Sequence, residues 1–506
     1  HVNAEIRDLL DQTKPEISLA IGDKFIYGSH TSWAIMGFFA RANYAYKNRY
    51  LIELNGRFDG SSRFPTDQQW GFFPSGSLGW VASEESFWEV LNPYWSFLKL
   101  RASYGSIGNQ DIGNNRFRAI MASSNSGWIM GETNVLTFSM PTALADGFTW
   151  ETIKTINGGV DMRFFNDDLG VSLDVYRRIN DGMVVGGSEV PSTFGATAPY
   201  ENAAQLTTNG WELGIDYHHR FSNGLRLNVS ANVSDALTIV TKHPRKTTSV
   251  IDGSNYEGKV YGEIWGFTTD RLFQESDFDE NGNLLPGIAT QTYFENSGYK
   301  YKYGPGDVKY MDLDGNGEIN WGDKTVENHG DWSRIGNATP RYEYNFKIGV
   351  DWKGIDLNIF FQGVGSRQYW ATGSMMIPGW NFSEGTYYAH QTDYWTPENT
   401  NAWYPRLAET NQPGQYSASG FNFLCQTRYL LDMSYLRLKN ITLGYSLPDK
   451  VLKKMHFEKF RIYFSAENVC EIDKLGDLPI DPETATSSGD GGAMGFGRIY
   501  PFTRQL

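Results

Sequence analysis

Apolar and polar residues alternate most completely between Trp211 and Ser234. The alternation runs on both sides of the turn residues Asn223 and Gly224. A period of two places one set of side chains on each face of a β-strand, and a short Asn-Gly loop joins two strands as an antiparallel hairpin. The pattern therefore predicts a hairpin with one apolar and one polar face. In its second strand the apolar positions are Leu225, Leu227, Val229, Ala231 and Val233, which alternate with polar residues that include Arg226, Asn228 and Asn232.

A hairpin with two such different faces fits two kinds of protein. In a β-sandwich the apolar face packs on a core and the polar face meets water. In a transmembrane barrel the apolar face meets lipid, the polar face meets a wet lumen, and a strand needs about ten residues to span the bilayer. Both strands of the hairpin have about this length in the pattern, so the hairpin alone leaves both interpretations open.

Similar alternation recurs along the chain and predicts roughly a dozen strands. Two stretches, at about 235–335 and 364–428, break the rhythm and are rich in Gly, Asn and aromatic residues. Interruptions of this length are expected to be ordered by their own packing or by an ion. Short turns that alternate with long loops are typical of outer-membrane barrels, with the long loops on the extracellular side. The other predicted strands are at 50–59, 73–81, 98–104, 158–163, 171–177, 342–352, 355–362, 435–447 and 461–467, and a short helix is predicted at 4–10.

Composition narrows the class of protein. The 506 residues contain no run of 18 apolar residues, which predicts that no transmembrane helix is present. The chain carries 44 basic and 58 acidic residues, a formal charge of −14, which argues against a nucleic-acid partner. The 54 Gly, 29 Tyr and 31 Phe suit tight turns and aromatic girdles. Two cysteines, Cys425 and Cys470, form no disulfide framework.

The sharpest local motif is an acidic loop in the first long interruption. Oxygen ligands at loop positions 1, 3 and 5, Gly at 6, a carbonyl at 7 and an acid at 12 form the calcium loop of EF-hands. The motif predicts a structural Ca²⁺ site, against the alternative of a metal-free acidic turn. The side chains of the first three residues, the Glu carbonyl, a water on Asn320 and the final carboxylate would supply the ligands: Asp312, Asp314, Asn316, Glu318, Asn320 and Asp323.

A second acidic motif begins in the same way but ends differently. Asp277, Asp279 and Asn281 occupy positions 1, 3 and 5, and Gly282 position 6. Position 12 is Ile288, which offers no side-chain ligand, so the sequence disfavours an ion here.

Aromatic residues gather in the second long stretch, where they suit either stacking on sugars or packing inside the loop. The chain has no nucleophile elbow, no H-E-x-x-H, no P-loop and no paired-cysteine motif, so we expect no enzymatic activity. A secreted glycosidase would need two carboxylates facing each other across a cleft, and the sequence pairs none. The aromatic residues are Trp370, Trp380, Tyr387, Tyr388, Trp395 and Trp403.

Several segments together resemble the SusC/RagA family of TonB-linked outer-membrane transporters from Bacteroidetes-type bacteria. The strongest is 434–448 (SYLRLKNITLGYSLP), which resembles the family's C-terminal signature. The others occur in the family's order: 55–64 (NGRFDGSSRF), 73–75 (FPS), 78–80 (LGW), 98–105 (LKLRASYG), 108–110 (GNQ), 150–151 (WE), 209–212 (NGWE) and 481–483 (DPE).

The resemblance implies an all-β fold: the C-terminal portion of a large antiparallel transmembrane barrel of the 22-stranded type, with long extracellular loops. Residues 1–506 are then one partial barrel domain, without counterparts of the plug domain and the TonB-contacting box. It implies location in the bacterial outer membrane and import of an oligosaccharide, driven through TonB and assisted by a SusD-like lipoprotein. Import of peptides, or a β-rich surface glycan-binding protein without transport, remain the alternatives.

The same reasoning predicts that residues 1–506 do not close a barrel on their own. Closure requires the first and last strands to pair with each other. An unpaired strand edge in lipid leaves N–H and C=O groups unsatisfied, at several kcal/mol each. We therefore expect an upstream barrel and plug portion to pair with both edges of this sheet.

Overall fold

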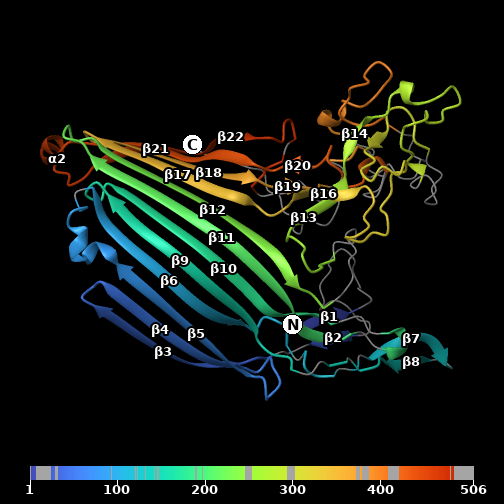
Figure 1. Ribbon diagram of the computed structural model, residues 1–506, viewed down its shortest axis with the longest axis horizontal. Coiled ribbons are helices and arrows are strands. Elements are labelled where there is room, and N and C mark those ends of the chain that lie inside the picture. Colours follow the sequence, from blue (N-terminus) through green and yellow to red (C-terminus); the bar gives the residue numbers. More distant parts are fainter. Residues whose placement is uncertain are drawn as a thin grey trace.

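In the computed structural model the regular secondary structure is almost entirely β-strand and is organised around one large antiparallel sheet (Figure 1). The structure describes residues 2–6, 24–28, 32–92, 94–114, 116–119, 121, 123–130, 133–141, 143–144, 147–187, 191–195, 198–244, 254–292, 302–371, 376–378, 387–407, 421–478 and 480–483. Twelve strands pair in the order β22-β21-β18-β17-β12-β11-β10-β9-β6-β5-β4-β3. Their bounds are β3 Ile35–Tyr46, β4 Tyr50–Ser61, β5 Trp70–Val81, β6 Trp95–Asn109, β9 Glu151–Phe164, β10 Leu169–Gly186, β11 Tyr200–Arg220, β12 Arg226–Lys242, β17 Arg341–Trp352, β18 Ile355–Ser366, β21 Tyr435–Ser446 and β22 Arg461–Asp473.

The two ends of this sheet differ in the length of their connections. At the end on the left of Figure 1, strands are joined by tight turns, by the short 3₁₀ helices η2 (Ala82–Glu84) and η3 (Ser86–Trp88), or by helix α2 (Asp449–Met455). At the other end lie all the long connections, including those between β12 and β17 and between β18 and β21. The predicted asymmetry of turns and loops is therefore confirmed.

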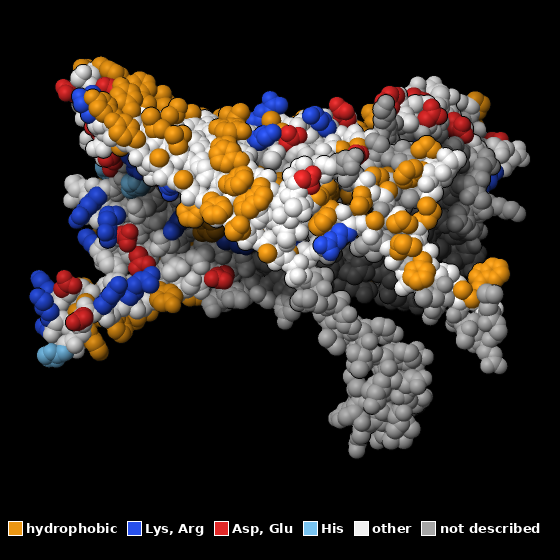
Figure 2. All heavy atoms as spheres, turned by 90° about the horizontal axis from the view of Figure 1, so that it is seen from below, with side chains coloured by type: hydrophobic (Ala, Val, Ile, Leu, Met, Phe, Trp, Pro, Cys, Tyr) orange, Lys and Arg blue, Asp and Glu red, His pale blue; other side chains and the backbone are white. Residues whose placement is uncertain are grey.

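The strand register separates the side chains into two faces. Leu227 lies in one transverse row with Val350, Leu357, Leu443 and Phe464 on neighbouring strands. The adjacent row contains Asn228, Gly349, Asn358, Thr442 and Ser465. We call the first side the apolar face and the second the polar face. In Figure 2, hydrophobic side chains gather in a broad band, and Lys, Arg, Asp and Glu gather at the tight-turn end and are also scattered toward the loop end.

Aromatic side chains border the apolar rows at the tight-turn end. Tyr and Trp are favoured at the boundary of a bilayer because their rings are amphipathic. Each of these rings is more than a third exposed, as expected for a girdle at a lipid boundary: Tyr46, Tyr50, Phe165, Phe221, Trp352 and Tyr445.

The hairpin strands are longer than the alternation predicts. β11 has 21 residues and β12 has 17, about twice the length that spans a bilayer. Beyond Trp211 the alternation becomes irregular: polar Asn209 pairs with Leu237 and Thr207 with Ile239, whereas Leu206 pairs with Val240. Cross-strand hydroxyl contacts hold this part of the ribbon, with 2.8 Å between the oxygens of Thr208 and Thr238 and 3.2 Å between those of Thr207 and Thr241. The strands therefore continue past the apolar band toward the long loops.

The long connections fold into a unit with its own core. We call the described residues of 243–340, 367–434 and 474–483 the loop unit. Its buried residues include Phe267, Phe273, Ile319 and Met433, each fully buried. This confirms that the long interruptions are ordered by their own packing. The unit contains β13 (Glu263–Phe267) paired with β16 (Trp332–Asn337), β14 (Thr269–Leu272) with β15 (Val308–Tyr310), and β19 (Gln368–Tyr369) with β20 (Leu431–Asp432), together with the 3₁₀ helices η5 (Glu275–Asp277), η6 (Ala389–Gln391) and η7 (Phe421–Phe423).

Some local expectations are wrong. Part of the predicted helix at 4–10 belongs to strand β1 (Val2–Ile6), which pairs with β2 (Lys24–Gly28), and residues 7–10 lie outside the described part. Outside the large sheet there are also the hairpin β7 (Ser123–Met130) and β8 (Thr133–Phe138) and the 3₁₀ helix η4 (Ser192–Phe194). Both cysteines are free thiols.

No helix in the described part of the chain is long and apolar enough to cross a membrane.

Each edge strand of the large sheet has one neighbour. Among the described residues, β3 pairs with β4 and β22 pairs with β21, and the two edge strands do not pair with each other. As described, the sheet is therefore open, and each edge carries a row of backbone groups without a partner strand.

The assignment of the apolar face to lipid can be tested with two neighbouring positions in β12. Arg in place of Val229, on the apolar face, should destabilise the folded protein in lipid by about 2–4 kcal/mol if the site lies near mid-bilayer. Ser230→Arg, on the polar face, should cost much less. Urea unfolding in lipid vesicles measures both changes. Equal costs for the two variants would contradict the assignment.

Candidate functional site

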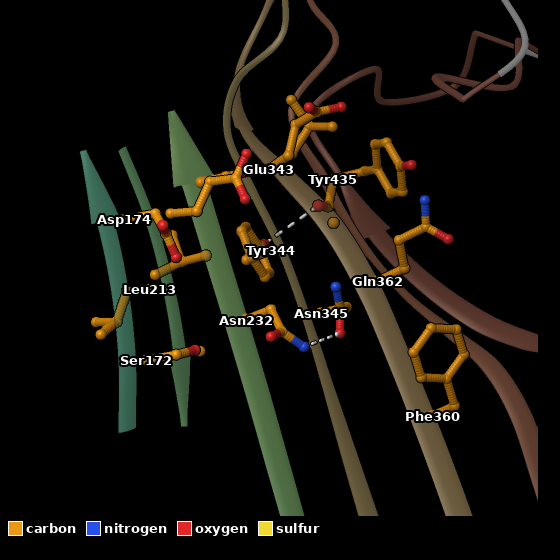
Figure 3. Close-up of a pocket in the computed structure, with 16 residues that line it drawn as sticks. Ser172, Asp174, Leu213, Asn232, Glu343, Tyr344, Asn345, Phe360, Gln362 and Tyr435 are labelled. Carbon is orange, nitrogen blue, oxygen red and sulfur yellow. Dashed lines mark hydrogen bonds between the residues drawn. The ribbon is translucent and has the colours of Figure 1, made fainter. Parts of the chain in front are cut away.

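The polar face of the large sheet carries a hollow of about 610 Å³. Strands β10, β11, β12, β17, β18 and β21 supply its lining. Figure 3 shows side chains from these neighbouring strands directed into it, with the Asn232 amide donating to the Asn345 side-chain oxygen at 3.1 Å. Gln362 follows Asn345 in the same transverse row. Amides and hydroxyls of this kind offer both donors and acceptors, so the wall suits a polar ligand.

One side of this wall is held by an arginine that crosses three strands. Arg101 on β6 donates to Asp161 on β9 at 2.8 and 2.9 Å, and to Asp174 on β10 at 2.9 Å through two nitrogens. Gly159 makes room for the guanidinium, because a Cβ there would lie 2.8 Å from its central carbon. A planar fork can bind two carboxylates in this way, whereas an ammonium cannot.

Further carboxylates continue the wall beyond Asp174. Ser234 on β12 pairs with Glu212 on β11 on one side and with Glu343 on β17 on the other. Neither has an ion-pair partner in the part of the chain that the structure describes. The hollow therefore has more acceptors than donors, and it can accept hydrogen bonds from ligand hydroxyl or N–H groups.

Two of the segments that carry the family resemblance meet at Arg437. Its side chain is 1% exposed, and it pairs with Glu471 on β22 and with Asp481 and Glu483 beyond that strand. The distance to Asp481 is 2.6 Å, and Lys439 adds a second cation to Glu483 at 2.9 Å. These contacts fasten the segment after β22 against β21. The signature residues 434–448 and 481–483 thus serve one structural junction.

Other resemblance segments meet in a second small core at the loop end of β4, β5 and β6. Phe64, Phe73 and Trp150 are buried together there, and the Trp150 indole donates to the Gln69 carbonyl at 2.8 Å. Glu151 accepts from the Asn109 amide at 2.7 Å. These residues therefore hold the loop ends of the neighbouring strands together.

The predicted calcium loop is compact and internally hydrogen-bonded. Asp312 accepts from the backbone N–H of Gly315 at 2.7 Å and of Gly317 at 2.9 Å. Asp314 accepts from the Asn316 N–H at 3.0 Å. These turns direct the Asp312 and Asp314 carboxylates toward a common point, as the motif predicts.

The remaining predicted ligands are placed differently. Asn320 donates from its amide to the Glu318 carbonyl at 3.0 Å, and the Glu318 carboxylate accepts from Thr292 at 3.2 Å. The Asp323 carboxylate accepts from Asn328 at 2.8 Å and does not join the other acids. The structure therefore does not place Asp323 where the motif predicts the closing ligand.

Asp331, rather than Asp323, lies beside the first two acids. Oxygens of Asp312, Asp314 and Asp331 lie within 4.8 Å of one another. Asp331 is fully buried, and burial raises its pKa, with the charge of Asp314 adding to the effect. Its carboxylate accepts from the N–H of Leu313 at 2.6 Å and of Asn320 at 3.0 Å. No Lys or Arg pairs with it among the described residues. The sequence gives no spacing signal for this residue, because it follows the motif by eight positions.

The second acidic motif is satisfied without an ion. Arg271 donates to Asp277 through two nitrogens at 2.6 and 2.7 Å. Asp279 accepts from the N–H groups of Asn281 and Asn283. An arginine thus neutralises the first acid of this motif.

The aromatic residues of the second long stretch divide between two environments. Trp395 is buried in the core of the loop unit, and Trp370 packs against it. Tyr387 and Trp403 remain 43% and 50% exposed. Trp380 lies outside the described residues. Some of these rings therefore pack inside the loop unit, and the exposed rings are accessible to other molecules.

Comparison with known proteins gives one family and two sets of relatives. Residues 5–469 match the family described as TonB-dependent receptor-like, β-barrel. The chain is 28% identical over 462 residues to TonB-dependent receptor P3 of Formosa agariphila, and 27% identical over 458 residues to TonB-dependent receptor SusC of Bacteroides thetaiotaomicron. Each match covers 89% of this chain, and 42% and 41% of the respective receptor. The chain thus spans about two fifths of the length of these relatives.

Solved structures of similar fold agree with the family match. The RagAB peptide importer superposes with a TM-score of 0.68 in its closed-closed state and 0.70 in its open-open state. Both matches have 21% identity and cover 98% of this chain, and 49% and 48% of the respective chain. At this identity the similarity supports the fold alone.

The Arg437 junction predicts a large loss of stability on truncation. Arg437→Ala leaves three carboxylates without their buried cation and should destabilise the folded protein by about 3 kcal/mol. Arg41→Ala is the matched control, because its pair with Glu53 is exposed, with side-chain exposures of 58% and 34%, and should cost about 0–1 kcal/mol. Urea unfolding in detergent compares the two. A cost for Arg437→Ala no larger than the control would show that the junction contributes little.

Proposed function

The chain belongs to the TonB-dependent receptor-like β-barrel family, and we propose that it forms part of a SusC/RagA-type transporter that imports a nutrient across the bacterial outer membrane. The outer membrane is the location of this family's barrels. The observation that carries the proposal is the separation of the twelve-stranded sheet into an apolar and a polar face. A polar wall with a hollow is what a solute path needs, and an apolar face is what lipid requires.

We propose further strands as partners of this sheet. The edges β3 and β22 each have one strand neighbour among the described residues. Within lipid their free N–H and C=O groups need partners, because no water is available there. The barrel and plug portion that the family resemblance implies would supply these strands and the contact with TonB.

A SusD-like lipoprotein is the partner that we propose on the loop side. The loop unit presents an ordered surface with its own core at that end of the sheet. Such a surface can support a stable contact with a second protein, whereas loops without a core would first have to be ordered on binding.

We propose an oligosaccharide as the nutrient. The wall of the hollow has amides, hydroxyls and carboxylates that suit a hydroxyl-rich ligand, and exposed aromatic rings lie in the loop unit. Import of peptides by the same mechanism is the alternative, favoured by the fold shared with the RagAB peptide importer. A surface glycan-binding protein without transport is less consistent with the exposed apolar rows. The relatives are described as receptors, which supports a non-enzymatic role.

Uptake by cells tests the proposal. Deletion of the gene should abolish growth on one class of oligosaccharide or peptide and leave growth on free glucose unchanged. Complementation with the wild-type gene should restore growth, and dissipation of the proton-motive force should stop uptake, because TonB transmits that energy. Uptake that continues without TonB would contradict the transport mechanism, and binding of a glycan without any uptake would favour the surface-binding alternative.

We propose that Asp312, Asp314 and Asp331 hold a structural Ca²⁺ ion. Three clustered carboxylates repel one another, and one of them is buried without a Lys or Arg partner among the described residues. Ca²⁺ prefers oxygen ligands and neutralises such a group. The Asn316 side chain and the Glu318 carbonyl belong to the same turn and would complete the set. Calcium would stabilise this loop and take no part in transport chemistry.

Calcium binding can be measured by terbium luminescence, because Trp332 follows Asp331 directly and can sensitise a bound lanthanide. Asp331→Asn should weaken binding by roughly tenfold or more. Asp323→Asn is the matched control and should have little effect, since Asn328 holds that carboxylate. Burial raises the pKa of Asp331, so affinity should begin to fall at a higher pH than for an ordinary aspartate as the solution is acidified. Equal effects of the two variants would contradict this ligand set.

A further inference from the structure

A second cavity, of about 590 Å³, lies where the loop unit meets the ends of β21 and β22. Its lining comes from Met376, from residues between 390 and 404, from 428–432, which precede β21, and from 474–478, which follow β22. This volume is in the range of sites for small molecules. The cavity is separate from the hollow on the polar face, with which it shares no lining residue.

Trp403 is the main aromatic group of this cavity, and its backbone is fixed. Its N–H donates to the Asp393 carboxylate at 3.0 Å. Its carbonyl accepts from Arg428 at 2.9 Å and from the Tyr429 hydroxyl at 3.0 Å. Three hydrogen bonds from two separate segments therefore hold the residue before any ligand arrives. Such preorganisation lowers the entropic cost of binding.

The ring of Trp403 nevertheless remains half exposed. Its neighbours are the Arg428 guanidinium, 5.1 Å from the ring centroid, and Tyr429, which meets it edge-on at 5.9 Å. By contrast, Tyr404 and Tyr429 are nearly fully buried. The surrounding residues thus hold the tryptophan in position, while part of its indole ring stays accessible to another molecule.

Several charged groups around the cavity are satisfied within the protein. Lys474 pairs with Asp432 at 2.8 Å, Asp393 accepts from Asn399 and Trp403, and Arg428 donates to two backbone carbonyls. A strongly charged ligand would find few free counter-charges here. A neutral ligand with many hydroxyl groups would find donors and acceptors at the rim of an aromatic surface.

We propose that this cavity binds a neutral sugar unit, with Trp403 as the stacking platform and the Asp432–Lys474 pair as hydrogen-bonding partner for hydroxyls. A pyranose ring presents an apolar C–H face, which suits the indole, and a rim of hydroxyls, which suits the paired charges. The inference rests on the proposed function and deepens it, because it names a saccharide as the ligand class and locates one subsite in the loop unit.

A peptide fits this cavity less well. Extended peptides commonly bind by adding a strand to an open sheet edge, which supplies main-chain hydrogen bonds. In this cavity, by contrast, the hydrogen-bonding groups are side chains arranged around the Trp403 ring. The ends and side chains of a peptide also carry charges, for which the internally paired groups offer little compensation.

The test measures binding of defined probes to the protein purified from outer membranes in detergent. The probes are three linear hexasaccharides, one each of glucose, xylose and mannose, and one hexapeptide. Isothermal titration calorimetry measures the binding of each probe. At least one hexasaccharide should bind, and Trp403→Ala should weaken it by roughly tenfold or more. Trp128→Ala is the matched control, because Trp128 is an exposed tryptophan in β7, at 80%, outside the cavity, and it should bind like the wild type.

Growth and uptake then separate this inference from the proposed function. Binding of no hexasaccharide, binding of the hexapeptide alone, or equal loss in both tryptophan variants would overturn the sugar subsite. If TonB-dependent uptake of a nutrient persists in those cases, the transport function stands and the subsite alone fails. If purified protein binds a hexasaccharide through Trp403 but cells show no uptake, the subsite stands and the transport function fails. Circular dichroism confirms that both variants are folded.

Discussion

The absence of water within a bilayer is the constraint on which this structure depends. Every N–H and C=O group of a spanning strand must find its partner in a neighbouring strand. The result is antiparallel pairing across twelve strands, interrupted locally by bulges such as those in β10 and β21, and between the bulges a residue's face follows from its place in the sequence. A shift of one residue would turn Leu227 and Val229 to the polar side and Asn228 to lipid. Backbone pairing therefore determines the chemistry of both surfaces.

The charged groups follow from the same constraint. Arg101 and Arg437 lie on the polar face, and each binds carboxylates from neighbouring strands or from the segment that follows them. They connect strands by side chains on the one face where charges are tolerated. Beyond the apolar band, charged side chains are no longer restricted to one face. There the loop unit is held together by a buried hydrophobic core.

The period-two pattern was sufficient to predict the sheet, because burial in lipid makes alternation complete. It failed for the outer parts of β11 and β12, where the alternation becomes irregular and the successive residues Thr207 and Thr208 give no apolar signal. The acidic motif predicted that Asp312 and Asp314 lie close together, because those residues belong to one local turn. Asp331 could not be predicted in this way. It reaches the other two carboxylates because the chain folds back between Gly322 and Gly330, both with positive φ, and that return depends on tertiary packing. Trp403 was recognisable as an aromatic residue, but its exposure was not.

The connections of the loop unit have a mechanical consequence. Chain segments enter it from the ends of β12, β17, β18, β21 and β22, and the Arg437 cluster fastens the last of these a second time. A flap that swings open needs its rotation to be concentrated in a few hinge residues. With five attachments spread over adjacent strands, no single axis allows this unit to swing freely. Because several separate chain segments fix it, the loop unit is expected to move little relative to that end of the sheet.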